Sequence, residues 1–175
     1  MPTAAPPVRS EPSAQIIEPD AASRQNAAET ARGIARLFAR NGIWCLSEMP
    51  LKNGRRADLM GIDAKGLIII VEIKVSRNDL LGDQKWPEYL EFCDRFFWGV
   101  PPSLERGPLL SEAYQPERCG IIVADAYDGE IIRQAALAQL APARRKAQVE
   151  RLARAALRRH TMLCDPDCAV PELHE

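Results

Sequence analysis

The most apolar stretch of the chain also carries charges. Residues 67–71 form an unbroken apolar run of the kind found in buried strands, and Glu72 and Lys74 follow within the same predicted strand. Asp58 precedes Glu72 with thirteen residues between them. Charged side chains are almost never fully buried unless they are paired or bind a metal. These three residues are therefore the first candidates for chemistry.

A predicted hairpin brings the two acidic residues together. Residues 56–62 and 67–75 are typical of strands, and the short loop between them has Gly66 where a three-residue hairpin loop often needs the left-handed conformation. Counting outward from this loop sets Asp58 directly opposite Glu72. Directly opposed residues share a face of the sheet, with Cβ atoms roughly 4.5–5.5 Å apart.

This arrangement suits a metal ion and a phosphate. Glu72 and Lys74 share a face because side chains alternate along a strand, so all three charged groups project from one side. Two opposed carboxylates repel each other unless a cation lies between them. Mg²⁺ and Mn²⁺ take hard oxygen ligands, often one or two carboxylates together with substrate phosphates. Lys74 would then orient or activate a water for attack on phosphorus. The alternative is a structural ion pair at the sheet rim, with Lys74 bridging Asp58 and Glu72.

Periodicity and turn residues predict the elements that position this cluster. A helical apolar stripe runs through residues 27–38, with ordered structure expected from about Ser23. Pro87 interrupts or restarts the helix after the charged strand, and Pro142 fits the first turn of a last helix. The other expected elements are strands at 43–49, 95–100, 120–124 and 130–133 and a helix at 78–93. The order is helix, three-strand meander, helix and strand, then a C-terminal hairpin and helix, which predicts an α/β fold.

Length and composition fit one globular domain. The chain has 175 residues, 46% hydrophobic and 27% charged, and its net charge of −1 creates no overall field that attracts nucleic acid or membrane. The composition predicts a disordered proline-rich leader at residues 1–22. We expect the folded domain at residues 23–160 and an acidic tail at residues 161–175. No apolar run approaches the ~20 residues of a membrane span, and the N-terminus lacks the apolar core of a signal peptide. We therefore expect a cytoplasmic protein without membrane contact, and its five cysteines argue against a disulfide framework.

The quoted residues also carry a family resemblance. Asp58 followed by Glu72-Ile73-Lys74 on a hairpin after an N-terminal helix resembles the PD-(D/E)xK nuclease superfamily, with Ala57 in place of the proline of the motif name. The run "VEIKVSRNDLLGDQKWPEYLEFCDRFFWGVP" is similar to its MmcB-type bacterial DNA repair family. The resemblance extends through the helix "LAPARRKAQVERLARAAL". It implies a restriction-endonuclease-like core, a mixed central sheet flanked by helices, and metal-dependent hydrolysis of phosphodiester bonds in DNA.

The same resemblance implies roles for the motif residues. Asp58 and Glu72 would be ligands of Mg²⁺ or Mn²⁺, with the Ile73 carbonyl as a third ligand. Lys74 would be the water-positioning base or an electrostatic partner. Proteins with this fold also include members without activity, so a DNA-structure binding module that recruits repair factors is a second hypothesis. A small interaction domain with a purely structural Asp58–Lys74 contact is a third. The DNA substrate and the oligomeric state stay open, a homodimer among the alternatives.

The segment "DQKWPEY" adds further candidates. Related nucleases often place a Gln or Lys on the helix after the catalytic strand, which implies catalytic roles for Gln84 and Lys85, with Asp83 beside them. Trp86 and Tyr89 can stack on an unpaired base, or pack against the sheet, which is favoured for Trp86.

A basic stripe marks the last predicted helix. Residues 141–160 hold seven Lys or Arg and a single acidic residue. Such a stripe can track a phosphate backbone, and a solvated helix face is the alternative. The predicted DNA contacts are Arg144, Arg151, Arg154 and Arg158.

Other polar residues have plainer explanations. Glu48 falls near Asp58 if the preceding turn closes symmetrically, but an exposed glutamate at a strand end is favoured over a further metal ligand. Glu29 is expected in a solvated helix pair. The C-terminal residues His160, Cys164, Cys168 and His174 match no common zinc spacing.

Overall fold

The structure, a computed structural model, describes residues 21–168 of the chain. A single six-stranded sheet has the strand order β1-β2-β3-β4-β5-β6. The first three strands are antiparallel neighbours, β4 and β5 continue in parallel with β3, and β6 is antiparallel to β5. The strands are β1 (Trp44–Pro50), β2 (Arg56–Ile62), β3 (Ile68–Ile73), β4 (Arg95–Val100), β5 (Gly120–Ala124) and β6 (Gly129–Arg133). The predicted mixed sheet and α/β class are confirmed.

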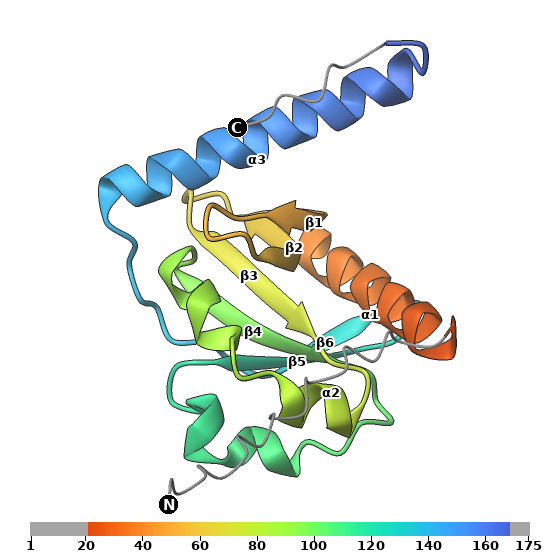
Figure 1. The fold of residues 1–175 in the computed structure, drawn as a ribbon, viewed down its shortest axis with the longest axis vertical. Coiled ribbons are helices and arrows are strands. Elements are labelled where there is room, and N and C mark those ends of the chain that lie inside the picture. The colour runs from red at the N-terminus through yellow and green to blue at the C-terminus, as the bar shows by residue number, and fades with distance from the viewer. Residues whose placement is uncertain (1–20, 169–175) are drawn as a thin grey trace, which may run out of the picture.

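Helices cover both faces of this sheet (Figure 1). One face packs against the first helix through Ile34 and Phe38, and the opposite face packs against the last helix through Leu152. Short helical segments fill the long connections between strands. The helices are α1 (Ala21–Arg40), α2 (Arg77–Gly82), η1 (Trp86–Glu91), η2 (Gly107–Leu110), η3 (Glu112–Tyr114) and α3 (Pro142–Cys164).

Two predicted boundaries need revision. Helix α1 begins at Ala21, two residues inside the predicted leader, whose other residues lie outside the described part of the chain. Helix α3 ends at Cys164 and not at His160, so the first four residues of the predicted tail are helical. The predicted helix at 78–93 is two short elements, because a separate 3-10 helix begins at Trp86 with Pro87 in its first turn.

The hairpin between β2 and β3 has the predicted register. Leu59 pairs with Val71, which leaves Asp58 in line with Glu72. Gly66 has φ +78°, in the left-handed region that glycine adopts at low cost. The Asp63 carboxylate accepts hydrogen bonds from the backbone N–H groups of Lys65 at 2.8 Å and Leu67 at 2.9 Å, which closes the loop. The relative position of the two acidic residues is therefore a local property of the hairpin.

A buried aspartate anchors the start of α3. Asp94, next to β4, accepts hydrogen bonds from the backbone N–H groups of Ile68 and Leu140, both at 2.8 Å. Its carboxylate also pairs with the Arg145 guanidinium at 2.6 Å. Because an unpaired buried carboxylate is costly, these bonds hold the connection before α3 against the edge of β3.

Candidate active site

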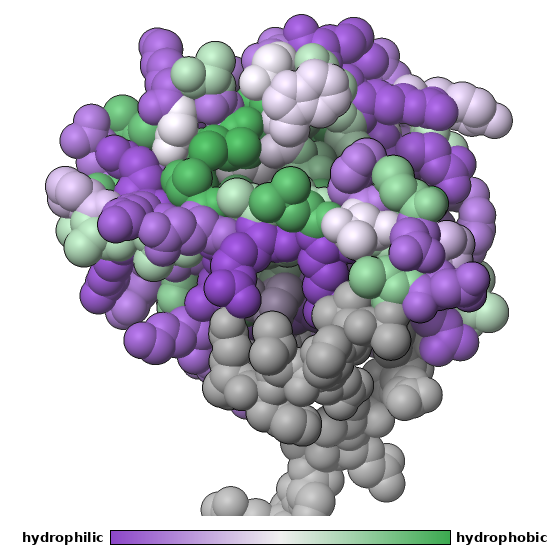
Figure 2. All heavy atoms as spheres, turned by 90° about the horizontal axis from the view of Figure 1, so that it is seen from above, coloured by the Kyte–Doolittle hydropathy of each residue, from purple (hydrophilic) through white to green (hydrophobic). Residues whose placement is uncertain are grey.

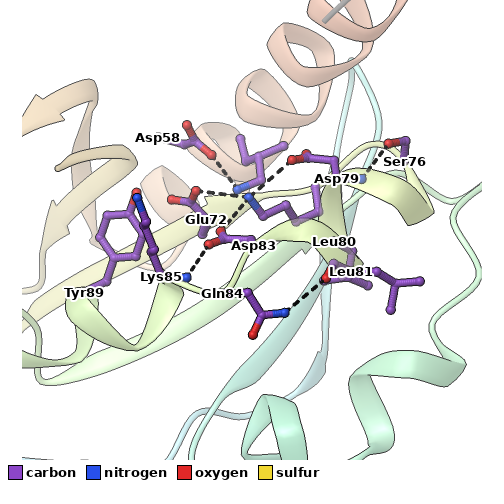
Figure 3. Close-up of polar contacts among 12 residues, drawn as sticks. Asp58, Glu72, Ser76, Asp79, Leu80, Leu81, Asp83, Gln84, Lys85 and Tyr89 are labelled. Atoms are coloured by element: carbon purple, nitrogen blue, oxygen red, sulfur yellow. Dashed lines mark hydrogen bonds and ion pairs between the residues drawn. The ribbon is translucent and has the colours of Figure 1, made fainter. Parts of the chain in front are cut away.

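Asp58, Glu72 and Lys74 meet where β3 ends (Figure 3). Asp58 comes from β2, and Lys74 directly follows β3, with its backbone N–H donating to the Gly99 carbonyl at 2.9 Å. That bond continues the parallel pairing of β3 with β4, so the backbone under the cluster is held on both sides. Glu72 is 7% exposed and Lys74 is 6% exposed. An acidic and a basic side chain are therefore buried side by side at the end of the strand.

The two carboxylates are held differently. Asp58 Oδ2 accepts a hydrogen bond from the Ile73 backbone N–H at 2.7 Å. Glu72 Oε1 accepts from Lys74 Nζ at 3.3 Å, whereas Glu72 Oε2 is buried and has no hydrogen-bond partner among the described residues. A buried, unpartnered carboxylate oxygen is unfavourable unless it takes a proton or a cation.

Lys74 contacts more carboxylates than the hairpin supplies. Its Nζ lies 2.8 Å from Asp83 Oδ2 and 3.6 Å from Asp79 Oδ1, besides the 3.3 Å contact with Glu72 Oε1. The ion pair that the structural alternative predicts, with Lys74 bridging Asp58 and Glu72, is therefore found only in part. The closest partner of Lys74 comes from the loop after α2.

Burial and mutual repulsion change the pKa of both acids. Burial, followed by repulsion from Asp58, raises the pKa of Glu72 to about 8. Burial also raises the pKa of Asp58 to about 6, although the hydrogen bond from Ile73 and the charge of Lys74 oppose the shift. The pair therefore takes up a proton more readily than two free carboxylates do, and the pKa of Glu72 is the more strongly raised.

Lys74 stays protonated. Burial lowers the pKa of its ammonium group, but the charge of Glu72 and the hydrogen bond to Asp83 outweigh burial and raise the pKa above its ordinary value. A group with a raised pKa cannot serve as a general base near neutral pH. Of the two predicted roles for Lys74, the electrostatic one fits this environment.

The loop between α2 and η1 brings Asp83 to the cluster. Ser76 caps α2, its hydroxyl accepting from the Asp79 backbone N–H at 3.1 Å, and the helix ends after six residues. Asp83 Oδ1 then accepts from the Lys85 backbone N–H at 3.0 Å, which leaves Oδ2 directed at Lys74 (Figure 3). The family resemblance made Asp83 a candidate together with Gln84 and Lys85, whereas no sequence pattern pointed to Asp79.

The side chains of the two catalytic candidates on this loop make no hydrogen bond or ion pair with Asp58, Glu72 or Lys74 among the described residues. Gln84 is exposed, and its amide donates to the Leu81 carbonyl at 3.5 Å, away from Lys74 (Figure 3). Lys85 is exposed, and its backbone N–H contacts Asp83. The residue of this segment that reaches the cluster is thus Asp83.

Trp86 and Tyr89 pack in the core. The Trp86 ring lies 5.2 Å from that of Trp98 and 5.7 Å from that of Phe96, measured between centroids, which confirms packing against the sheet. The Tyr89 hydroxyl donates to the Arg56 carbonyl at 3.2 Å. Burial, and then the charges of Glu72 and Asp58, raise the Tyr89 pKa. Base stacking on these two rings is not compatible with their burial.

The carboxylate oxygens of Asp58 and Glu72 fit a hard divalent cation whose other ligands are water and phosphate. Asp58 and the unpartnered oxygen of Glu72 offer carboxylate oxygens on one face. Among residues 21–168, no group of three or more His, Cys, Asp or Glu side chains is arranged to hold a metal ion. Mg²⁺ commonly binds through one or two carboxylates, with water and phosphate completing its shell. The Ile73 carbonyl as a third ligand stays a prediction.

Glu48 lies next to this pair. The register between β1 and β2 places it in line with Asp58, as predicted, and its charge contributes to the raised pKa of Asp58. Glu48 has φ +53°, which is uncommon for a non-glycine residue inside a strand, and it pairs with Arg56. Its side chain is half exposed, in agreement with the favoured interpretation as an exposed glutamate. Glu29 accepts a hydrogen bond from Gln25 within α1 at 2.6 Å.

The predicted arginine stripe of α3 is only partly available to a ligand. Arg151 donates to the Pro50 carbonyl at 3.2 Å, so it supports the turn after β1, and its contact with DNA stays a prediction. Arg144 pairs with Glu91 at 3.4 Å, and Arg154 and Arg158 are exposed.

The apolar side of α3 is also partly open. Leu152 is buried, but Leu157, predicted in the same stripe, is 67% exposed. Figure 2, which looks down on α3, shows hydrophobic side chains gathered in the middle of this face and framed by hydrophilic ones. An apolar groove of about 240 Å³ lies there between α3 and β1, with Trp44 and Ala153 among its lining residues.

The C-terminal histidine and cysteines form no metal cluster within the described residues. Cys164 Sγ lies 3.6 Å from His160 Nε2, one helical turn away on α3. Both cysteines of this region, Cys164 and Cys168, are free thiols, and His174 lies outside the described residues.

The fold and the site define an α/β protein with a mixed sheet and a buried acid–lysine cluster at the end of its third strand. The chain matches the family described as DNA repair protein MmcB-like over residues 15–167, and it belongs to that family. The predicted family is thus confirmed. None of the helices in residues 21–168 is long and apolar enough to span a bilayer.

Two solved structures are similar to the chain. SPO1766, a protein of unknown function from Silicibacter pomeroyi, has 40% sequence identity and a TM-score of 0.76, over 85% of this chain and 97% of that chain. Pyrococcus furiosus SfsA, solved in complex with Ca²⁺, has 11% identity and a TM-score of 0.37, over 63% of this chain and 64% of that chain. No curated protein matches the chain.

Proposed function

We propose that the protein is a Mg²⁺- or Mn²⁺-dependent DNA endonuclease acting in repair. The observation that carries the proposal is the pair of half-buried Asp58 and buried Glu72 beside a protonated lysine, with one Glu72 carboxylate oxygen that has no partner among the described residues. Membership in a DNA repair family supports DNA as the substrate. Perturbed pKa values at paired acids are characteristic of functional sites.

The geometry supplies a division of roles in phosphodiester hydrolysis. Asp58 and Glu72 would hold the metal, which when bound neutralises charge on the scissile phosphate. The Ile73 N–H fixes the Asp58 carboxylate, so its free oxygen keeps one orientation. Lys74 remains charged and can hold a water or a phosphate oxygen in line for the displacement. As the bond from the water oxygen to phosphorus forms and the bond to the leaving oxygen breaks, the water would lose a proton to solvent and the leaving oxygen would take one from solvent.

A cleavage screen tests this proposal. Wild-type protein is expected to cut at least one of branched, nicked or single-stranded DNA in Mg²⁺ or Mn²⁺, and Asp58→Asn is expected to lower the rate by at least about a thousandfold. Asn can still accept the bond from Ile73, so the hairpin stays intact. Gln84→Ala is a matched control in the same region, because its amide faces Leu81. Full cleavage activity in a folded Asp58→Asn protein would contradict the assignment of Asp58 to the active site.

One observation favours a second function. Lys74 lies closer to Asp83 than to Glu72, and Gln84 turns away, so the site holds its lysine in a network of acids. The alternative is a DNA-structure binding module of the same fold that recruits repair factors and does not cut. Binding of branched DNA by wild type without cleavage of any substrate, in either metal, would establish that alternative.

The exposed arginines of α3 are the proposed contacts with the phosphate backbone. Replacing Arg154 and Arg158 with Gln is expected to weaken DNA binding and to reduce the slope of log K against log salt by about 0.9 for each phosphate that the variant no longer neutralises. Arg24→Gln with Arg32→Gln on α1, which covers the opposite face of the sheet, is the control. Titrations at several salt concentrations measure the slope. An equal slope in wild type and variant would leave α3 as a solvated face.

A further inference from the structure

A second pocket lies outside the proposed active site, and polar side chains contribute to its lining. It has a volume of about 470 Å³ and lies between the β1–β2 turn, the end of η1 and the first half of α3. The turn contributes Lys52 and Asn53, the segment after η1 contributes Phe92, and α3 contributes Arg144 and Gln148. Ligand sites commonly have volumes of ~300–1,000 Å³. The pocket is therefore large enough for a single small ligand and too small for a duplex.

Gln148 marks this pocket as a binding site. It lines the pocket, is 5% exposed, and its side-chain carbonyl oxygen has no hydrogen-bond partner among the described residues. Leaving a buried amide oxygen unpaired costs about 1–3 kcal/mol. A hydrophobic residue would fill the same space without that cost. A buried amide oxygen without a partner is suited to a ligand that brings a hydrogen-bond donor.

Two basic side chains and an aromatic ring also contribute to the lining. Lys52 and Arg144 are exposed at the rim, where they can meet an anion. One acid, Glu91, also lines the pocket, and it pairs with Arg144 at 3.4 Å. Phe92 is half-buried and offers part of an aromatic ring. Two cations, a ring and a carboxamide together match the parts of a nucleotide: phosphate, base face and base edge.

The turn that forms one wall is held in place. Arg55 pairs with Glu88 of η1 at 2.9 Å and 3.2 Å, and Arg151 of α3 donates to the Pro50 carbonyl at 3.2 Å. The Tyr89 hydroxyl donates to the Arg56 carbonyl at 3.2 Å. The same turn leads into β2, which carries Asp58, so a ligand in the pocket lies next to the proposed site along the chain. The wall is thus pre-formed, which lowers the entropy cost of binding.

We propose that this pocket takes one unpaired nucleotide of a DNA strand. Gln148 would read the edge of its base, Phe92 would contact the base face, and Lys52 and Arg144 would bind its phosphate. A base inside a duplex cannot reach a buried carboxamide, so the nucleotide must have left the stack. The assignment deepens the proposed function, on which it rests for DNA as the polymer, and it names DNA with unpaired nucleotides as the substrate class.

Binding measured without metal tests the pocket separately from cleavage. Fluorescence anisotropy in EDTA compares a blunt labelled duplex with the same duplex carrying one unpaired thymidine. Wild type is expected to bind the bulged duplex about tenfold more tightly, as a stacked and hydrogen-bonded base contributes ~1–3 kcal/mol. Gln148→Leu and Lys52→Gln are each expected to lose most of this preference and keep their affinity for the blunt duplex. Arg158→Gln, on the same helix outside the pocket, is expected to weaken both complexes by the same factor.

The results separate the possible failures. Equal affinity of wild type for the two duplexes would overturn the proposal. A Gln148→Leu protein with a lower melting temperature and an unchanged preference for the bulged duplex would also overturn the proposal. The Gln148 amide would then have a structural role, with a buried water as its partner. Lys52 is exposed, so Lys52→Gln decides the matter if Gln148→Leu does not fold. Absence of cleavage together with a retained preference would contradict the nuclease and support the pocket.

Discussion

Glu72→Gln is expected to make the metal-free protein more stable than wild type at about pH 9 and equally stable at about pH 5. The pKa of Glu72 is about 8 in the folded protein, against an ordinary value of 4.5. Between those values the folded protein binds a proton that the unfolded chain releases, so the stability of wild type falls as the pH rises. One pKa unit corresponds to about 1.4 kcal/mol, so the shift of the Glu72 pKa predicts a loss on the order of 5 kcal/mol. Glutamine is neutral and removes this loss.

Urea unfolding of both proteins at several pH values measures the effect. The raised pKa of Asp58, about 6, also lowers the stability of wild type as the pH rises, by a smaller amount. Glu72→Gln reduces this second loss of stability, because it removes the repulsion between the two carboxylates. Glu150→Gln, on the exposed surface of α3, is the matched control and is expected to follow the wild-type curve. If Glu72 and Lys74 instead formed a structural ion pair, Glu72→Gln would be less stable than wild type above about pH 5, because the variant would break a buried ion pair.

Asp58→Asn is expected to abolish stabilisation by Mn²⁺ without lowering the melting temperature of the metal-free protein. In wild type, a metal at about one hundred times its dissociation constant stabilises the folded state by about 2.7 kcal/mol. Because the metal displaces the proton of Glu72, its affinity is expected to fall about tenfold for each pH unit below about 8. Asn removes a negative ligand and also relieves the repulsion within the pair.

Thermal melts with and without Mn²⁺, and calorimetry in two buffers with different ionisation enthalpies, measure stabilisation and proton release. Glu105→Gln, an exposed acid paired with Arg77, is expected to keep the wild-type response. A large drop in the metal-free melting temperature of Asp58→Asn, with no response of wild type to metal, would show that the acid cluster is a structural brace. Proton release on metal binding would be absent in that case.

The sequence by itself determined the hairpin and therefore the central pair. Strands β2, β4 and β5 have the predicted bounds, and Gly66 has the predicted left-handed conformation. Alternation of side chains and the geometry of a three-residue loop depend on neighbouring residues only. These local rules are enough to place Asp58 opposite Glu72 and to put both acids on one face.

Only the tertiary structure decided which groups surround that pair. Asp83 is the closest partner of Lys74 because α2 ends after six residues and its following loop turns back over the end of β3. Residue spacing along that segment did not distinguish Asp83 from Gln84 or Lys85. Trp86 follows the same loop as the first residue of η1, and it is buried because its ring packs on that of Trp98 in β4.

The last helix shows the same division. Its apolar periodicity predicted a helix, but part of the stripe is exposed, and the sequence carried no sign of how far α3 extends past the sheet. Arg151 supports the turn after β1, and Gln148 closes a pocket with Lys52, because α3 crosses that turn. The pattern of neighbouring residues in the sequence determines whether a residue lies in a helix or a strand. The partner of a buried charge or amide depends instead on which distant segment of the chain packs over it.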